Sequence, residues 1–340
     1  AAVVAALLGL GWWSLVLGYL VEGAAQSLLV LRVAPPGVWP RWSRHAFADL
    51  FGFGSGQTLA GIANWVATQG DYVVVGRNFD AGTLGAYTRA YDIMRFPAKT
   101  FTNIAGKVLF ASFARLQDQP HQLADAFCRS LTLSAMVLLP ASAGLIVLAP
   151  EAIRIMLGPG WDHAVVPFQI MATSMMFRTS YKSASMVARS AGDVFAIAWA
   201  QGLYAVAVVG GAALSARWGI AGVAATIAAA VALHFLNLTR LAKKHLPVSW
   251  ADVVRAHAPG VTLALITTAA AWPAAVALRQ ASAHTAVVAV VVSAVGGVVG
   301  LGFVGWQVRR GSPSWRWAVQ AMRSGTIGKR KKKAKRRAAQ

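Results

Sequence analysis

The sequence predicts an all-α, polytopic membrane protein. Of the 340 residues, 57% are hydrophobic and only 13% are charged, whereas soluble domains carry about 25% charged residues. The hydrophobic residues form long blocks, each near the roughly 20 residues that span the hydrocarbon layer of a bilayer. These blocks include residues 11–31, 131–149, 195–216, 219–238 and 285–308. A water-soluble protein with a set of buried apolar helices is the alternative, and so many blocks argue against it.

The predicted helices can be placed in order along the chain. The chain begins inside an apolar run, AAVVAALLGLGWW, without the charged start and the cleavage site of a signal peptide. We therefore expect a truncated helix at residues 1–8 and further helices upstream of it. About nine complete spans follow, near residues 11–31, 47–71, 86–110, 127–149, 164–187, 195–215, 218–239, 253–275 and 285–308.

The distribution of positive charge predicts the orientation in the membrane. Twelve of the 32 Lys and Arg residues lie in residues 309–340, and a basic run beside a membrane is typical of a cytoplasmic tail that attracts anionic lipid. No motif for reading nucleic acid accompanies it, so no nucleic-acid partner is expected. With this tail inside, alternating spans also place the other basic loops inside, as the positive-inside rule requires. The predicted outer loops carry one cation each, namely Arg77, Arg154, Arg217 and Arg279.

The sequence offers no chemistry of an enzyme or a metalloprotein. Cys128 is the only cysteine, the seven His residues show no metal-ligand spacing, and no pair of acids forms a short catalytic motif. A membrane-embedded glycosyltransferase would need an acidic motif on a substantial outer loop, and the predicted outer loops are short. We therefore predict no enzyme, no catalytic residue, no metal and no cofactor.

Three predicted helices carry polar residues at helical spacing inside apolar sequence. In the helix near 86–110 the polar residues fall within an arc of about 120°, and they are Arg89, Asp92, Arg95, Lys99, Asn103 and Lys107. The helix near 164–187 shows the same helical spacing of polar residues, at Arg178, Lys182, Ser185 and Arg189. The helix near 47–71 shows it at Gln57, Asn64, Thr68 and Asp71. A charge that faces lipid costs at least ~2.5–3.5 kcal/mol, so such residues usually face a bundle interior or a watery cavity.

Two interpretations of the charged stripe remain open at this point. Arg89, Asp92 and Arg95 are spaced to pair along their own helix, and the residues at its ends can extend to the interfaces. Lys99 and the cations of helix 164–187 lack a local carboxylate, which favours a cavity with excess positive charge. Such a cavity suits phosphate or pyrophosphate. The predicted substrate-binding residues are Arg89, Arg95, Lys99, Arg178 and Lys182, and the predicted polar lining is Gln57, Asn64, Asp71, Asp92 and Asn103.

Three segments in a fixed order carry a family resemblance. They are FGFGSGQTLAGIANWVATQGDYVVVGRNFDAGTLGAYTRAYDIMRFPA, VLFASFARLQD and LLPASAGLIVLAPEAIRIMLGPGWDHAVVPFQIMA. Together they resemble the oligosaccharide and polysaccharide flippases of the multidrug, oligosaccharidyl-lipid and polysaccharide exporter superfamily. The matching positions are Asp71, Gly76, Gly85, Tyr87, Ala90, Pro97, Pro140, Pro150, Gly158 and Trp161. Ala111 departs from the pattern, because the family often has Pro there. The resemblance covers about residues 10–245.

The resemblance implies a fold of two six-helix lobes around a central cationic cavity, often followed by two extra helices. On that plan residues 1–45 end the first lobe and form a cytoplasmic inter-lobe loop, and residues 46–245 form the second lobe. Residues 246–310 form the extra pair, and residues 311–340 form the basic cytoplasmic tail. Most of the first lobe would then be absent from the chain.

The function implied by the resemblance is transport by alternating access. The substrate would be a polyprenyl-pyrophosphate-linked oligosaccharide, flipped across the plasma (inner) membrane for cell-surface polysaccharide synthesis. Implied partners are this substrate, anionic lipid at the basic tail, a polysaccharide polymerase and glycosyltransferases. One alternative is a multidrug or other ion-coupled antiporter of the same superfamily, for which only Asp71 and Asp92 could serve as coupling carboxylates. The other alternative is a truncated fragment without activity of its own.

Overall fold

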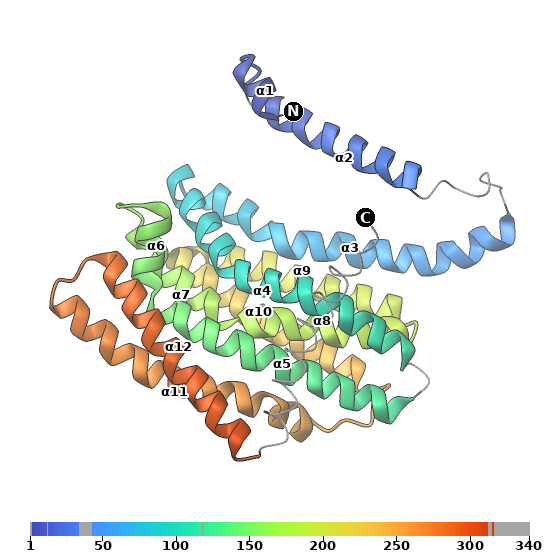
Figure 1. The fold of residues 1–340 in the computed structure, drawn as a ribbon. Coiled ribbons are helices and arrows are strands. Elements are labelled where there is room, and N and C mark those ends of the chain that lie inside the picture. Colours follow the sequence, from blue (N-terminus) through green and yellow to red (C-terminus); the bar gives the residue numbers. More distant parts are fainter. Residues whose placement is uncertain (1, 12, 34–42, 117–118, 312–314, 316–340) are drawn as a thin grey trace, which may run out of the picture. The chain divides into compact units, whose positions relative to one another are not determined.

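The structure is a computed structural model that describes residues 2–11, 13–33, 43–116, 119–311 and 315 (Figure 1). The described residues form helices and connecting turns, with no strand among them. The predicted all-α membrane fold is thereby confirmed. The helices are α1 (Ala2–Leu7), α2 (Trp13–Val33), α3 (Arg44–Asn78), α4 (Ala81–Arg115), α5 (Pro120–Val147), α6 (Ala149–Leu157), α7 (Val165–Thr173), α8 (Met175–Ser190), α9 (Val194–Ser215), α10 (Gly219–Ala242), α11 (Trp250–Gln280) and α12 (Thr285–Arg309).

One predicted helix is broken in the structure. The helix expected near 164–187 begins with a short 3₁₀ turn and is divided into α7 and α8 at Ser174. The Ser174 hydroxyl donates to the Met171 carbonyl at 2.7 Å, and the Ser174 backbone N–H donates to the same carbonyl at 3.1 Å. A serine that bonds back to the preceding turn competes with the regular helical ladder and tightens it locally. The single-helix prediction was wrong here because this local competition is not visible in hydropathy.

The chain divides into two compact units, residues 1–52 and 53–340. In the first unit α1 packs against α2, and Gly18 permits a close approach, because a Cβ atom there would lie 2.8 Å from the Ala2 Cβ. Most of α2 is exposed and apolar, including Leu20 and Leu29. So apolar a surface is suited to lipid or to a protein partner rather than to water.

The second unit contains the main hydrophobic core. Buried side chains from α3, α4, α5, α7, α8, α9 and α10 form one large cluster, and a second cluster joins α5, α8, α9, α10 and the start of α11. In Figure 1 the α3–α4 connection, α6 and the α11–α12 connection lie at the same end of this unit. The long helices therefore alternate in direction, as successive membrane crossings do.

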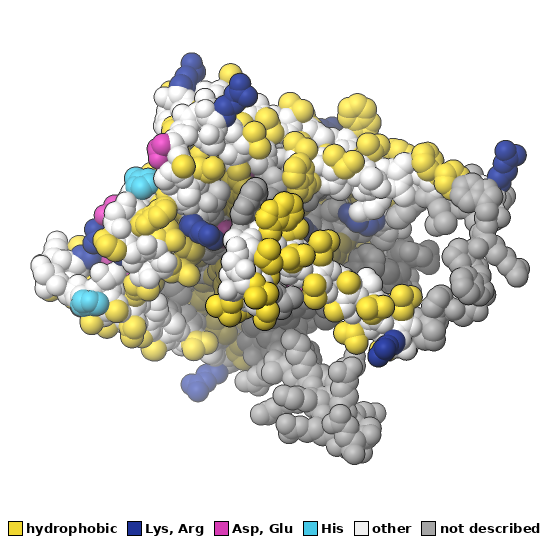
Figure 2. Space-filling model, turned by 90° about the horizontal axis from the view of Figure 1, so that it is seen from above, with side chains coloured by type: hydrophobic (Ala, Val, Ile, Leu, Met, Phe, Trp, Pro, Cys, Tyr) yellow, Lys and Arg dark blue, Asp and Glu magenta, His cyan; other side chains and the backbone are white. Residues whose placement is uncertain are grey.

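Five helical segments of the described chain are long and apolar enough to cross a membrane. They are Val16–Val33, Pro120–Val147, Val194–Ala242, Trp250–Gln280 and Thr285–Arg309. Figure 2 shows the consequence on one face, where hydrophobic side chains are abundant and Lys and Arg side chains stand singly among them. The protein is a multi-pass membrane protein.

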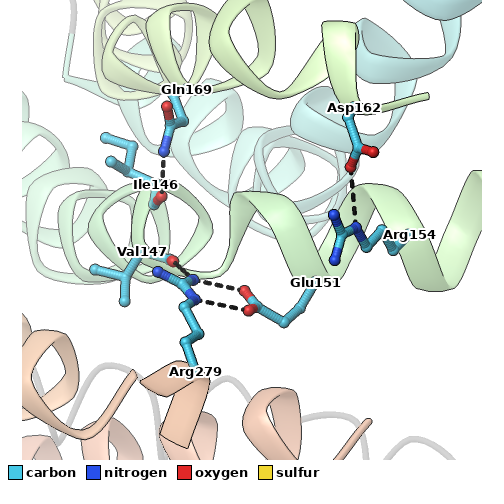
Figure 3. Close-up of polar contacts among 7 residues, drawn as sticks. All are labelled: Ile146, Val147, Glu151, Arg154, Asp162, Gln169 and Arg279. Atoms are coloured by element: carbon cyan, nitrogen blue, oxygen red, sulfur yellow. Dashed lines mark hydrogen bonds and ion pairs between the residues drawn. The ribbon is translucent and has the colours of Figure 1, made fainter. Parts of the chain in front are cut away.

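Two contacts hold α11 against the rest of the second unit. At Gly260 a Cβ atom would lie only 2.4 Å from the backbone of Ala135, so α11 and α5 touch almost backbone to backbone. At the other end of α11, Arg279 binds both carboxylate oxygens of Glu151, at 2.8 Å and 2.7 Å, and also donates to the Val147 carbonyl at 2.7 Å (Figure 3). The carboxylate comes from α6, so this ion pair joins elements that are far apart in sequence.

The start of α4 is capped by Asp80. Its side chain accepts a hydrogen bond from the Thr83 backbone N–H at 3.0 Å and another from the Thr83 hydroxyl. These two donors hold the pKa of the Asp80 carboxyl below its usual value. The cap ends the α3–α4 turn and fixes where the first turn of α4 begins, which sets the rotation of all the residues that follow on this helix.

Some predictions lie outside the described residues. The basic tail predicted for 311–340 is described only at Gly311 and Trp315. Most of the basic loop between α2 and α3 falls in residues 34–42, which are also outside. The side chain of Lys107, the last cation of the α4 stripe, is likewise not among those described.

Candidate functional site

One face of α4 presents charged and polar side chains at the surface. Arg89, Asp92, Lys99 and Asn103 are exposed. Phe96 interrupts this stripe and is 70% exposed, so the face is a surface rather than a packed contact in the described chain. The predicted polar stripe of this helix is therefore present as one open face.

The opposite face of α4 is buried and aromatic. Tyr87 and Tyr91, one helical turn apart, are 0% and 1% exposed, and their rings stack with centroids 6.3 Å apart. The ring of Tyr72 on α3 meets both of them edge-on, at 6.0 Å and 5.7 Å. Such edge and stacked arrangements are favourable for aromatic pairs. This aromatic trio fixes α4 against α3 and so orients the charged face.

Asp71 is buried beneath the aromatic trio. Its side chain is 1% exposed, and its Oδ2 accepts a hydrogen bond from the Tyr87 hydroxyl at 2.9 Å. Its Oδ1 has no hydrogen-bond partner among the described residues. A buried carboxylate with one unused oxygen is costly unless another group or ion reaches it.

Arg178 of α8 lies on the buried side of Tyr91. Its Nη1 donates to the Tyr91 hydroxyl at 2.6 Å, and its Nε donates to the Ser174 hydroxyl at 3.2 Å. The residue is 8% exposed, and its guanidinium carbon lies 4.8 Å from the centroid of the Tyr91 ring. The break at Ser174 thus supplies a hydroxyl to a guanidinium that would otherwise have fewer partners.

Arg95 and Lys182 complete a cluster of positive charge near Arg178. The Arg95 guanidinium carbon lies 5.0 Å from the Tyr91 ring centroid, so Tyr91 contacts two cations. Lys182 is partly buried and lies one turn after Arg178 on α8. We call Arg95, Arg178 and Lys182 the cation cluster. The structure brings these three predicted residues together.

Pairing of charges along α4 was one of the two interpretations left open by the sequence, and the structure does not show it. The ion pairs recorded among the described residues do not join Asp92 to Arg89 or to Arg95. Arg95 turns instead toward the Tyr91 ring. The exposed Asp92 and Arg89 can separate because solvent screens both of them and the net value of an exposed pair is small.

The remaining predicted residues lie along α3. Gln57 and Asn64 are partly buried. Asp71 is buried and accepts a hydrogen bond from the Tyr87 hydroxyl. The structure therefore does not bring the ten predicted residues into one enclosed pocket among the described residues. They form an exposed stripe on α4, the cation cluster in which only Arg178 is fully buried, two partly buried amides on α3, and the separate carboxylate of Asp71.

Sequence reasoning missed the aromatic residues that organise this region. Tyr87 and Tyr91 share a face at i, i+4, and Tyr72 directly follows Asp71, so the spacing carried a signal. A further buried group was also missed, in which His234 of α10 stacks on Tyr204 at 4.3 Å and meets Tyr181 edge-on at 4.8 Å. Both ring nitrogens of His234 lack a hydrogen-bond partner among the described residues.

The exposed and partly buried charges of the region are mostly positive. Among the described residues no group of three or more His, Cys, Asp or Glu side chains could hold a metal ion. Besides the buried Arg178, four cationic side chains are exposed or partly buried here, namely Arg89, Arg95, Lys99 and Lys182. The α4 stripe carries a single described acid, Asp92. Guanidinium and ammonium groups in general form charge-assisted hydrogen bonds with phosphate oxygens.

The chain is similar to proteins of polysaccharide biosynthesis. A family model described as polysaccharide biosynthesis protein matches residues 1–166. The lipopolysaccharide biosynthesis protein WzxC of Escherichia coli (strain K12) is 28% identical over 168 residues, which cover 48% of this chain and 34% of that protein. The succinoglycan biosynthesis transport protein ExoT of Rhizobium meliloti (strain 1021) is 27% identical over 218 residues, covering 63% and 44%. The teichuronic acid biosynthesis protein TuaB of Bacillus subtilis (strain 168) is 27% identical over 124 residues, covering 36% and 26%.

Comparison with solved structures shows the fold. The lipid II flippase MurJ, in an inward closed conformation, superimposes with a TM-score of 0.64 and 15% sequence identity, covering 88% of this chain and 63% of that one. The resemblance to polysaccharide flippases predicted from the sequence is confirmed by these matches. The chain spans less than half the length of each curated relative named above.

Proposed function

We propose that this chain is part of a flippase for a polyprenyl-pyrophosphate-linked oligosaccharide. The full protein would move this substrate from the inner to the outer leaflet of the plasma membrane during synthesis of a cell-surface polysaccharide, with the C-terminus in the cytoplasm. The names of the relatives support the proposal, because one is a transport protein of succinoglycan biosynthesis and the structural neighbour is a lipid II flippase. Polysaccharide polymerases and glycosyltransferases are the proposed partners.

The cation cluster is the observation that carries the proposal. Arg95 and Lys182 are partly buried beside Arg178, and the recorded ion pairs of the described chain give none of the three a carboxylate partner. Excess positive charge at membrane depth is costly unless an anion or a watery cavity compensates it. A pyrophosphate group fits this demand, because it offers several oxygens to Arg forks and Lys ammonium groups.

The proposed division of roles follows burial. Arg89, Arg95, Lys99 and Lys182 are accessible enough to bind the pyrophosphate directly, whereas Arg178 adds its charge from the buried side of Tyr91. The polar residues Gln57, Asn64, Asp92 and Asn103 would contact sugar hydroxyls. Transport would proceed by alternating access of this site, formed by the proposed second lobe, residues 46–245, together with the rest of the full-length protein.

Export by the full-length gene product tests the proposal. The measurement is surface polysaccharide in a strain that lacks its own flippase, with membrane insertion followed by immunoblot. Arg95→Ala and Lys182→Ala should each reduce export by roughly tenfold or more, since a hydrogen bond to a charged group contributes about 1.5–3 kcal/mol. Arg77→Ala is the matched control, because Arg77 is exposed at the end of α3, off the stripe. Normal export by both cluster variants would refute the proposed site.

A second candidate function, ion-coupled antiport, is favoured by one observation. Asp71 is buried and its Oδ1 has no partner among the described residues, and ionisable residues inside the membrane commonly serve ion or proton pathways. If the carboxylate couples an ion, Asp71→Asn should keep substrate binding and abolish the dependence of transport on the ion gradient. If Asp71→Asn transports with an unchanged gradient dependence, the carboxylate is structural and this candidate is excluded.

A further inference from the structure

A pocket of about 370 Å³ lies where α10 ends and α11 begins. It is lined by Leu236, Asn237 and Arg240 of α10 and by Trp250 of α11. These residues stand at the ends of two of the apolar segments that can cross a membrane, Val194–Ala242 and Trp250–Gln280. By length and composition the two segments end beside this pocket, so a membrane–water boundary is expected there, and Trp side chains are enriched at such boundaries.

The polar side of the pocket has unused hydrogen-bond donors. Arg240 is exposed, and in the described part of the chain neither its guanidinium nor the Asn237 amide has a recorded hydrogen-bond or ion-pair partner. The Lys243 ammonium lies 4.4 Å from the centroid of the Trp250 ring. Lys243 thus lies over the ring of a pocket residue, and Arg240 lines the same pocket.

Two acids contact the α10–α11 connection, and each has a partner of its own. Asp252 accepts hydrogen bonds from the backbone and hydroxyl of Ser249 in a capping box and lies 3.6 Å from Arg255. Asp193 contacts His245 at 2.6 Å. Among the described residues, no hydrogen bond or ion pair is recorded between either of these two carboxylates and Arg240 or Lys243, so both cations keep donors for an anion from outside the chain.

The α10 side of the pocket also carries apolar side chains. Leu236 is 47% exposed, and Leu233, one turn earlier on the same face of α10, is 63% exposed. A free inorganic anion would gain nothing from these side chains. A ligand with a phosphate at one end and a hydrocarbon chain at the other would use both ends of the site.

We propose that this pocket binds one anionic glycerophospholipid. Arg240 and Asn237 donate to its phosphate, Lys243 supplies a second charge, and an acyl chain lies along Leu236 and Leu233. Basic pockets at helix ends are general sites for anionic head groups. The lipid would fill the junction between α10 and α11. This proposal does not depend on which substrate the protein transports.

Lipid retention by the purified full chain tests the proposal. The protein is incubated in detergent with phosphatidylglycerol or with phosphatidylcholine, and bound lipid is counted by native mass spectrometry. The wild-type chain should retain phosphatidylglycerol in preference to phosphatidylcholine. Arg240→Ala should lower the apparent affinity for phosphatidylglycerol about fivefold, the effect of one basic residue near a lipid surface, and Arg240→Lys should restore part of it.

The chain offers a matched control at the other end of α10. The Arg217 guanidinium lies 4.2 Å from the Trp218 ring centroid, so it is also an Arg beside a Trp at a helix end, but it does not line the pocket. Arg217→Ala should leave retention unchanged. Equal losses in both variants would show a general surface-charge effect and overturn the proposal. So would displacement of the lipid by millimolar inorganic phosphate, which would identify a simple phosphate site. An unchanged melting temperature of Arg240→Ala confirms that the variant is folded.

Discussion

Glu151 and Arg279 form a two-point ion pair across 128 positions of sequence. The Glu151 side chain is 6% exposed and that of Arg279 is 33% exposed. Arg279 also donates to the Val147 carbonyl at the end of α5 (Figure 3). A single guanidinium therefore ties the end of α11 both to α6 and to the last turn of α5. From the sequence alone, Arg279 is predicted only as the lone cation of an outer loop.

Loss of Arg279 should destabilise the attachment of α11. Arg279→Ala leaves the buried Glu151 carboxylate and the Val147 carbonyl without their donors. Breaking a buried pair costs about 3–5 kcal/mol, and since Arg279 is one-third exposed we expect about 2 kcal/mol, measured as a lower midpoint of unfolding in detergent. The Arg154–Asp162 pair is the control, because both partners are more than half exposed. Arg154→Ala should change little, and an equal effect of the two variants would contradict the clamp.

Gly260→Ala should separate α11 from α5. The added Cβ would lie 2.4 Å from the Ala135 backbone, which cannot rotate away as a side chain can. Overpacking of this kind costs about 1–3 kcal/mol, and the loss should appear as a lower melting temperature and faster proteolysis of the α10–α11 loop. Gly297→Ala is the matched control on α12, because nothing lies within 4 Å of a Cβ there. A Gly260→Ala chain as stable as this control would show that the two helices are not in contact.

Tyr91→Phe should destabilise the cation cluster while keeping the ring. The Tyr91 hydroxyl is the acceptor for Arg178 Nη1, so its removal leaves a buried charged donor unpaired at a cost of about 1–3 kcal/mol. The measurement is again unfolding in detergent. Tyr72→Phe is the control, because the Tyr72 ring contacts the same trio but its hydroxyl has no hydrogen bond recorded among the described residues. Equal stability of the two variants would show that the hydrogen bond from Arg178 to the Tyr91 hydroxyl does not stabilise the fold.

The proposed topology can be checked with single cysteines in a Cys128→Ser chain. Met156 is 62% exposed in the last turn of α6, and Lys244 is exposed after α10. The α7–α8 pair, α9 and α10 separate them, so they should lie on opposite sides. Met156→Cys should react with an impermeant maleimide in intact cells, and Lys244→Cys only after permeabilisation. Labelling of both from one side would show that an even number of crossings separates them.

The sequence by itself determined the class of this protein and the position of most of its helices. Apolar runs near 195–215, 218–239 and 285–308 became α9, α10 and α12, because bilayer thickness and backbone hydrogen bonding leave a long apolar run little choice but a helix. The charged stripe of α4 was also predictable, because residues on one helix share a face through local geometry alone.

Only the tertiary structure decided what each polar residue contacts. In the structure Arg178 donates to the Tyr91 hydroxyl, and Arg95 lies over the same ring. Asp71 accepts a hydrogen bond from Tyr87, and Arg279 pairs with Glu151. The structure also breaks the predicted helix at Ser174, whose hydroxyl serves Arg178. Two of these contacts are local, namely the bond of Arg178 to Ser174 and the approach of Arg95 to Tyr91, which lies four residues earlier on α4. The others join residues on different helices. Helical periodicity gives the direction of a side chain around its own axis, but the partner is set by how neighbouring helices rotate and pack against one another.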